Sequence, residues 1–279
     1  MNHEAGKGNV DPHYERGSLV ERLETALAAD GFDSRPPRPE DLAALDQFHS
    51  RGLDATVELA QALDLDSTTR VLDIGSGLGG PSRYLAATSG CTVQGIDLSP
   101  SFVDAASFLA AKTGLADRVT YQCANALSLP FGPEAFDVAW TQHVAMNIAD
   151  RATLYAEAFR VLRPGGRFAI FDVVAASDEP LHFPVPWAAG PETSFLVTAE
   201  RMRTVLLDAG FSIVSWTDST VAGLAWFAER QRERAQQQAM PALGLHIAMG
   251  PGFREMTANL ARNLREGRAA LIQAILSKP

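Results

Sequence analysis

The chain has 279 residues, 46% of them hydrophobic, and a formal net charge of −9. This composition is that of a globular protein and excludes a disordered one, and the length suits one large α/β domain or two small ones. No apolar run reaches the roughly 20 residues that cross a bilayer, and an acidic chain without a stripe of lysine and arginine binds nucleic acid poorly.

The first residues lack the basic and apolar regions of a secretory signal, so we expect a cytoplasmic protein with no membrane and no nucleic-acid partner. Two cysteines, Cys91 and Cys123, are too few for a disulfide framework or an all-cysteine zinc site. We expect both to be reduced and packed in the core. No metal site is expected either.

The N-terminal part of the chain changes character three times. Residues 1–17 are rich in glycine and poor in apolar side chains, which predicts a mobile tail. Residues 18–30 carry a leucine every fourth position and predict a helix. Residues 32–41 contain three prolines, so they predict a linker, and a single helix is expected from about residue 42 to 64.

The middle of the chain alternates between strand-like and helix-like patterns. Such β-α-β alternation predicts a parallel sheet with helices on both faces. Residue types typical of helix ends support the boundaries: Pro81 and Pro100 at first helical positions, Ser99 and Asp150 as N-caps, and Gly114 and Gly210 just past helix ends. The strand-like runs are 70–75, 91–97, 119–125, 136–143, 167–174 and 211–217.

After Trp216 the pattern becomes helical again, with exposed amphipathic helices expected over 222–239 and 252–266. By its pattern alone, the segment 269–277 fits a helix or a strand. The C-terminal helices are expected either to cap a site or to form the surface of a homodimer.

The strongest local signal is a glycine-rich loop that joins a strand to a helix. Gly75, Gly77 and Gly80 satisfy the G-x-G-x-x-G pattern, and Asp97 follows the next strand, 22 residues after Gly75. A carboxylate at that point can accept hydrogen bonds from both hydroxyls of a ribose. These features alone fit a nicotinamide dinucleotide, and hence an oxidoreductase, as well as they fit S-adenosylmethionine.

Three further features favour S-adenosylmethionine. Asp73 lies two residues before the first glycine, where a carboxylate can attract the ammonium of an amino acid. Asn125 closes the third strand, and its amide can read an adenine edge. The run 161–166 then turns a helix into the fifth strand.

With these motifs the chain resembles the class I S-adenosylmethionine-dependent methyltransferases over about residues 42–217. The resemblance implies an α/β, Rossmann-like, seven-stranded and mostly parallel sheet whose last strand, 269–277, is antiparallel. It also implies S-adenosylmethionine as the cofactor and a small-molecule methyl acceptor as the partner. The motifs are VLDIGSGLGG (71–80), GIDLS (95–99), ANALSLPF (124–131), FDVAWTQHV (136–144) and RVLRPGGRFAIFD (160–172).

The resemblance also divides the chain and assigns the site. Residues 1–41 form an N-terminal tail and helix, 42–217 the cofactor-binding core, and 218–279 a helical excursion and the final strand of the same domain. The resemblance is strongest to bacterial methyltransferases of the sarcosine and dimethylglycine kind, which favours an amine nitrogen as the acceptor over a hydroxyl or carbon. The expected cofactor-binding residues are Asp73, Gly75, Gly77, Gly79, Asp97, Leu98, Asn125, Ala126, Gln142 and His49.

His143 is the candidate catalytic residue, because it follows the fourth strand at the edge where open α/β sheets bind ligands. A neutral imidazole there can orient an acceptor or take its proton, although a histidine satisfied by the backbone at a strand end fits equally well. The segment around Trp187 is expected to form a substrate lid, whereas Trp226 and Phe227 are expected to face the core of a cap helix. A protein that keeps the fold and cofactor but acts as a binding protein or cyclase stays open.

Overall fold

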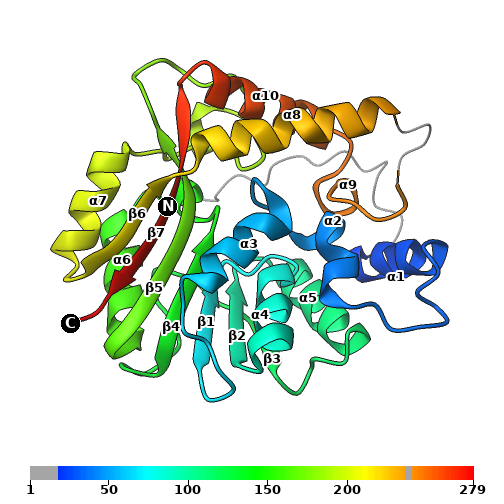
Figure 1. Ribbon diagram of the computed structural model, residues 1–279, viewed down its shortest axis with the longest axis horizontal. Helices are drawn as coiled ribbons and strands as arrows, with labels where there is room; N and C mark the ends of the chain where they lie inside the picture. The colour runs from blue at the N-terminus through cyan, green and yellow to red at the C-terminus, as the bar shows by residue number, and fades with distance from the viewer. Residues whose placement is uncertain (1–17, 237–240) are drawn as a thin grey trace, which may run out of the picture.

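The computed structural model describes residues 18–236 and 241–279, so the tail predicted over 1–17 lies outside the described residues. Its centre is a seven-stranded sheet in the order β3-β2-β1-β4-β5-β7-β6 (Figure 1). β7 pairs antiparallel with both β5 and β6, while the other pairings are parallel. This confirms the Rossmann-like sheet with an antiparallel last strand. The strands are β1 (Arg70–Ile74), β2 (Thr92–Asp97), β3 (Val119–Cys123), β4 (Phe136–Gln142), β5 (Leu162–Ala175), β6 (Ser212–Asp218) and β7 (Ala269–Ser277).

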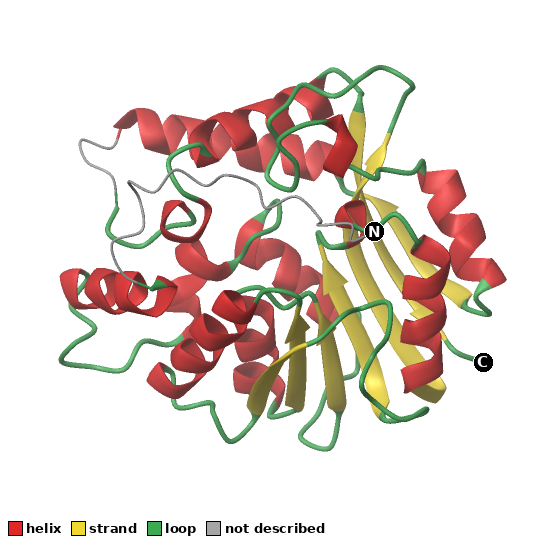
Figure 2. Cartoon of the chain, turned by 180° about the vertical axis from the view of Figure 1, so that it is seen from behind, coloured by secondary structure: helices red, strands yellow, loops and turns green. Residues whose placement is uncertain are grey.

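Helices cover both faces of the sheet (Figure 2). Leu59 of α3 and Leu85 of α4 belong to the apolar cluster on one face, whereas Tyr155 of α6 and Leu206 of α7 belong to the cluster on the other. Because both faces of the sheet are covered, nearly every residue of β4 is buried, which is typical of strands in a parallel sheet. The helices are α1 (Leu19–Ala29), α2 (Ala43–Asp46), α3 (Gly52–Gln61), α4 (Gly80–Ser89), α5 (Pro100–Lys112), α6 (Arg151–Val161), α7 (Ala199–Asp208), α8 (Thr220–Gln236), α9 (His246–Met249) and α10 (Phe253–Arg265).

Local chemistry fixes the helix ends where the sequence predicts them. The side chains of Ser99 and Asp150 accept hydrogen bonds from the backbone N–H of the third residue of α5 and α6, so both N-caps are confirmed. Gly114 and Gly210 follow α5 and α7 with φ of 71° and 101°, a backbone conformation that favours glycine.

The single helix expected over 42–64 is wrong. A 3₁₀ turn (Pro39–Leu42) leads into the short α2, and the chain then breaks before α3. At the break Arg51 has φ of 66°, which no helix interior tolerates. The reason is tertiary: His49 turns inward and is 5% exposed, where its side chain joins buried hydrogen bonds.

Smaller corrections concern the strand ends. β3 stops at Cys123 and β4 at Gln142, so Asn125 and His143 lie in loops just beyond their strands. β5 begins at Leu162, directly after α6 and earlier than predicted. Cys91 is buried as expected, but Cys123 is exposed at the end of the edge strand β3.

The C-terminal helices lie across one end of the sheet. Figure 1 shows α8 and α10 running above the carboxyl ends of the parallel strands, with α9 beside them. α8 and α10 pack against each other and against β7, and Leu260 and Leu264 of α10 are buried there. Within the described ranges, no helix combines the length and apolarity that crossing a membrane requires.

Candidate functional site

The glycine-rich loop is held tightly at the carboxyl end of β1. The backbone N–H groups of Gly75 and Ser76 both donate to the carbonyl of Ile96, at 2.8 and 2.9 Å, which ties the loop to β2. Gly75 has φ of 76°, and a Cβ there would overlap Cγ2 of Val144 in the loop after β4. This residue is therefore glycine for both conformational and steric reasons.

Gly79 has a neighbour that the sequence did not predict. A Cβ at Gly79 would overlap the hydroxyl of Tyr121, which donates to the Gly79 carbonyl at 3.2 Å. Gly77 instead faces Phe48, whose ring is 3.5 Å from the position a Cβ would take. Thus protein side chains surround these predicted cofactor-binding glycines, and Phe48 connects the loop to the segment between α2 and α3.

Asp97 joins the tip of the loop to the end of β2. One carboxylate oxygen accepts from the Gly77 N–H at 3.0 Å and the other from the Ser99 N–H at 2.9 Å. Next to it, the Leu98 side chain is 73% exposed, which is unusual for a large apolar residue in this chain. A carboxylate beside an apolar surface is suited to a molecule that carries hydroxyl groups next to a flat ring.

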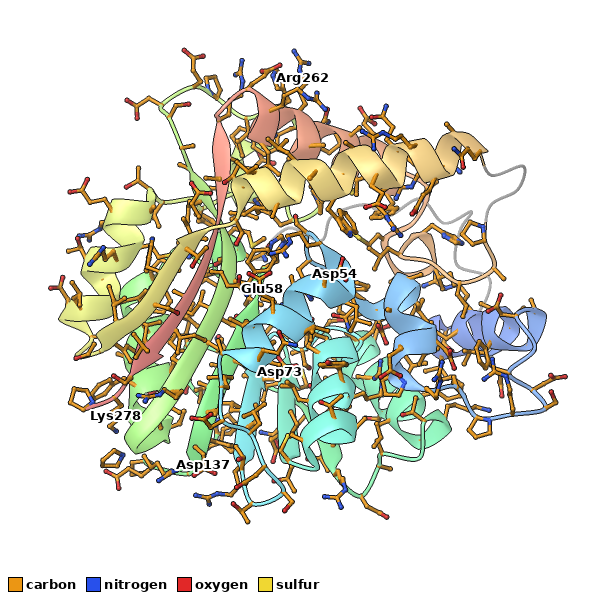
Figure 3. The ribbon with its side chains drawn as sticks, in the orientation of Figure 1. Asp54, Glu58, Asp73, Asp137, Arg262 and Lys278 are labelled. Carbon is orange, nitrogen blue, oxygen red and sulfur yellow. The ribbon has the colours of Figure 1, made fainter. Side chains whose placement is uncertain are left out.

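Asp73 lies beneath the loop. It is 2% exposed, and its carboxylate accepts a hydrogen bond from the Ser82 hydroxyl of α4 at 2.5 Å. Burial raises the pKa of Asp73 to about 7, and the nearby charge of Asp97 acts in the same direction. Figure 3 shows Asp73 enclosed between β1 and the neighbouring helices, so it supports the loop from below.

Asn125 and Ala126 follow β3 at the same edge. The Asn125 side-chain oxygen accepts from the Leu127 N–H at 2.9 Å and forms a local turn. Its side-chain nitrogen has no partner among the residues that the structure describes, and the side chain is exposed. Ala126 packs partly against the apolar cluster. Asn125 thus uses one end for the turn and presents a donor with the other.

His143 follows β4 in a left-handed backbone conformation, with φ of 53°. Its ring packs on Phe171 with centroids 5.0 Å apart, and the ring of His49 is 6.0 Å away. Nε2 is buried and has no hydrogen-bond partner in the described part of the chain. Burial holds the pKa of His143 well below its ordinary value, and His49 adds to this, so the ring is neutral near pH 7.

A buried polar network surrounds this histidine. The Thr56 hydroxyl of α3 lies 2.7 Å from the side-chain oxygen of Gln47 and 3.3 Å from that of Gln142. The indole N–H of Trp140 donates to the same Gln142 oxygen at 3.0 Å. The orientation of Gln142 is therefore fixed, and its side-chain nitrogen is buried without a partner in the described ranges. A buried unpaired donor of this kind favours a ligand that can accept from it.

The predicted role of His49 in cofactor binding does not match its contacts. Nδ1 is 3.2 Å from the Ser50 carbonyl, and Nε2 is 3.0 Å from Gln47 and 3.1 Å from Thr56. Burial lowers the pKa of His49 to about 4. Both nitrogens are thus engaged, and His49 positions the segment between α2 and α3. Its neighbour Arg51 pairs with Glu58 at 2.5 Å.

A cleft of about 1670 Å³ opens between the carboxyl ends of the parallel strands and the C-terminal helices α8, α9 and α10. Phe48, His49 and His143 line it from the side of the sheet, and Trp226 and Phe227 of α8 line it from the other side. Phe227 packs against the core as expected, and both aromatic residues also line the cleft, which the sequence did not predict. The residues labelled Asp54 on α3 and Arg262 on α10 in Figure 3 also line the cleft.

The expected lid segment contributes little to this cleft. Among the described residues between 181 and 196, Pro186 lines it, whereas Trp187 packs toward the core and donates to Ser194 at 3.0 Å. The segment therefore closes over the sheet. Sequence reasoning assigned no role to Phe48, Thr56 and Tyr121. They belong to no recognised motif, and each contacts a residue far away in sequence: Gly77, Gln142 and Gly79 respectively.

Comparison with known proteins identifies the family. A family model described as "Methyltransferase domain" matches residues 72–170. Over 226 residues, covering 78% of this chain and 80% of the relative, the chain is 30% identical to the O-methyltransferase resE of Aspergillus sclerotiorum. The chain belongs to the S-adenosylmethionine-dependent methyltransferases. This confirms the predicted enzyme class and cofactor.

Other relatives match this methyltransferase over less of their length or with less identity. This chain is 37% identical over 134 residues to the methyltransferase GfsG of Streptomyces halstedii, and the match covers 48% of the length of GfsG. The [4+2]-cyclase SpnF superimposes with a TM-score of 0.66 at 23% identity, covering 94% of this chain and 97% of SpnF. A putative sarcosine dimethylglycine methyltransferase from Galdieria sulphuraria superimposes with a TM-score of 0.66 at 19% identity, covering 81% of this chain and 86% of that protein. These two structures show the fold alone.

Proposed function

We propose that this methyltransferase moves a methyl group from S-adenosylmethionine to a hydroxyl group of a bulky, largely apolar small molecule. The observation that carries the proposal is the neutral ring of His143, whose unpaired Nε2 is buried and which lines a cleft of about 1670 Å³. A hydroxyl loses its proton as the new bond forms, and a neutral imidazole can take it. An amine acceptor, which the sequence favours, needs little help from a base and does not need so large a cleft.

The residues at the edge of the sheet fit the cofactor. S-adenosylmethionine supplies a methyl group that is already electrophilic on its sulfonium sulfur. Asp97, at the tip of the glycine loop, would accept from the ribose hydroxyls, and the exposed Leu98 would pack on the adenine. The free amide nitrogen of Asn125 would donate to that ring, and the buried nitrogen of Gln142 would donate to the amino-acid end.

The chain itself mainly aligns the reactants and excludes water, which lowers the barrier by several kcal/mol. As the acceptor oxygen receives the methyl group, Nε2 of His143 would take the proton that the hydroxyl loses. The rings of His49 and Phe171 pack against the ring of His143 and keep it in place. We further propose that residues 42–217 bind the cofactor, while the helices within 218–279 cover the acceptor, because α8, α9 and α10 line the cleft.

Methyl-labelled cofactor tests the proposal with two pools of acceptors. One pool holds glycine, sarcosine and dimethylglycine, and the other holds phenols, hydroxylated macrolides and sterols. We expect label in the second pool. Label confined to the amine pool overturns the hydroxyl proposal and restores the amine expected from the sequence. Tight binding of the demethylated cofactor without transfer to either pool favours a non-methylating protein on this fold.

A further inference from the structure

The charge of the cleft is opposite to that of the protein. The chain carries a net charge of −9, yet among the residues lining the cleft seven are arginines and three are acidic. The arginines come from α1, α8, α10 and the segment before α3, so they surround the cleft instead of following one helix. They are Arg22, Arg51, Arg230, Arg234, Arg254, Arg262 and Arg265, and the acidic residues are Glu21, Asp54 and Glu233.

Only part of this positive charge is neutralised within the described chain. Arg51 pairs with Glu58, Arg230 with Glu233 and Arg262 with Glu266. Four arginines remain, namely Arg22, Arg234, Arg254 and Arg265. In the part of the chain that the structure describes, no carboxylate lies within 4.0 Å of their guanidinium groups. The Nε atoms of Arg22 and Arg230 are also buried without a partner in these ranges. Both arginines are otherwise only half-buried, and a buried Nε–H without a partner is costly, which favours an acceptor bound beside it.

Three of these arginines form a local cluster. Arg230 and Arg234 lie one turn apart on α8, and Arg254 begins α10, which packs against α8. Burial lowers the pKa of Arg234, and the charges of Arg254 and Arg230 lower it further. Arg254 also lowers the pKa of His246 in α9. Like charges that affect one another in this way are stabilised by an anion placed between them.

Aromatic rings hold two of the guanidinium groups in place. Cζ of Arg230 lies 5.8 Å from the ring centre of Trp226, and Cζ of Arg234 lies 5.9 Å from that of Phe253. Both rings line the cleft, so charged donors and apolar surface lie side by side. A guanidinium fork matches the two oxygens of a carboxylate or phosphate, and the aromatic surface matches an apolar skeleton.

We propose that the acceptor is an amphipathic anion whose carboxylate or phosphate group binds Arg230, Arg234 and Arg254 while its apolar body packs on Trp226 and Phe253. This inference deepens the proposed function and rests on it, because it assigns the second end of a molecule whose hydroxyl meets His143. The arginine cluster sets which hydroxylated molecules the cleft accepts, and His143 takes the proton at the reacting end.

Binding measurements without methyl transfer test this inference. Three pairs of probes of different shape are compared by calorimetry in the presence of the demethylated cofactor: a long-chain hydroxy fatty acid, a hydroxylated steroid acid and a phenolic acid, each with its methyl ester. We expect at least one acid to bind about tenfold or more tightly than its ester, as charge-assisted hydrogen bonds predict. If none of the three acids binds more tightly than its ester, the inference is overturned.

Variants locate the effect. The double variant Arg234→Gln/Arg254→Gln should abolish the preference for the acid, and a double lysine variant should keep part of it. Arg232→Gln is the matched control, because Arg232 is exposed on the same helix and is not among the residues lining the cleft. An equal loss in the control means that general charge, not this cluster, is responsible. Because no methyl transfer is needed, a preference for the acid can persist even where hydroxyl methylation fails.

Discussion

His143 is held by Phe171 through two contacts at once. The backbone N–H of His143 donates to the backbone carbonyl of Phe171 at 2.7 Å, and the two side-chain rings pack with their centroids 5.0 Å apart. The first contact belongs to the β4–β5 pairing, which ends with Gln142 opposite Phe171. The catalytic candidate is thus fixed by the sheet itself, in spite of its left-handed backbone conformation.

Replacing this histidine tests its role as a base. In His143→Ala the turnover of a hydroxyl acceptor should fall by roughly 100- to 10,000-fold, because the proton then has no acceptor in place. Binding of the demethylated cofactor should change little. His182→Ala is the control, since His182 is a histidine that is not among the residues lining the cleft. Full turnover in His143→Ala removes the residue from the mechanism.

The burial of His143 should determine how the activity of the wild-type enzyme depends on pH. His143 accepts a proton only when neutral, so activity is lost as the pH falls through its pKa. Because burial and His49 hold that pKa well below 6.5, kcat/KM should stay level from about pH 8 to about pH 6. A profile that halves near pH 6.5, and that becomes flat in His143→Ala, would show an imidazole with an ordinary pKa and contradict the structure.

Asp97 should matter for the cofactor and not for the acceptor. In Asp97→Asn the affinity for the demethylated cofactor should fall about 10- to 100-fold, because a charged acceptor of ribose hydroxyls is lost. The amide oxygen can accept from one backbone N–H only, so the variant can keep the contact with Gly77 at the tip of the loop but loses the one with Ser99. Calorimetry on Asp97→Asn and on the exposed Asp104→Asn gives the comparison. Equal affinities in the two variants would place the ribose elsewhere.

Alanine substitutions of two glycines can separate the cost of a left-handed backbone conformation from the cost of a steric overlap between side chains. Gly75→Ala should lower the free energy of unfolding by about 2–5 kcal/mol, because both a left-handed conformation and an overlap with Val144 are imposed. Gly114→Ala shares the positive φ, but a Cβ there would meet nothing within 4 Å, so its cost should be only about 1–2 kcal/mol. Denaturant unfolding measures both.

The double variant Gly75→Ala/Val144→Ala completes this experiment. Shortening Val144 removes the overlapping methyl groups and should recover part of the lost stability. If Gly75→Ala proves no worse than Gly114→Ala, the loop accommodates the methyl group, and the overlap with Val144 has no energetic weight.

The sequence predicts the elements whose cause is local. Ser99 and Asp150 cap their helices because the hydrogen bond spans only three residues, and Gly75 follows β1 because the strand-loop-helix pattern is contiguous. The final strand, 269–277, could not be told from a helix by its pattern and needed the family resemblance. This strand lies between β5 and β6 and is buried along most of its length, so it is apolar except for Gln273 and the terminal Ser277, and the alternation of a strand is hidden.

What the sequence could not predict depends on contacts between distant residues. The chain breaks after α2 because Thr56 contacts both Gln47 and Gln142, the second of which lies 86 residues further along the chain. Helix propensity does not contain that information. The charge of the cleft is hidden for a similar reason. Arg22 and Arg254 lie in helices at opposite ends of the chain, and the net negative charge gives no sign that arginines gather there.

Asp73 gives a prediction with a definite sign in pH. Its pKa in the folded protein is about 7, above the value of 3.8 for an unperturbed carboxyl, so between these two values the folded state binds more protons than the unfolded state. The contribution of Asp73 to stability is therefore fully present below about pH 4 and is lost as the pH rises to about 7. Asp73→Asn cannot ionise, so its stability relative to the wild type should increase over that interval, by up to about 4 kcal/mol.

Urea unfolding of the cofactor-free protein at several pH values measures this difference. Asp66→Asn is the control of opposite sign, because hydrogen bonds from Thr68 and Thr69 lower the pKa of the exposed Asp66. The amide at residue 73 still accepts from the Ser82 hydroxyl, so the two folded structures should match. A difference between Asp73→Asn and wild type that does not change with pH means that Asp73 ionises as freely in the folded protein as in the unfolded chain. The hydrogen bond from Ser82, which lowers the pKa of this carboxyl, would then offset the effect of its burial.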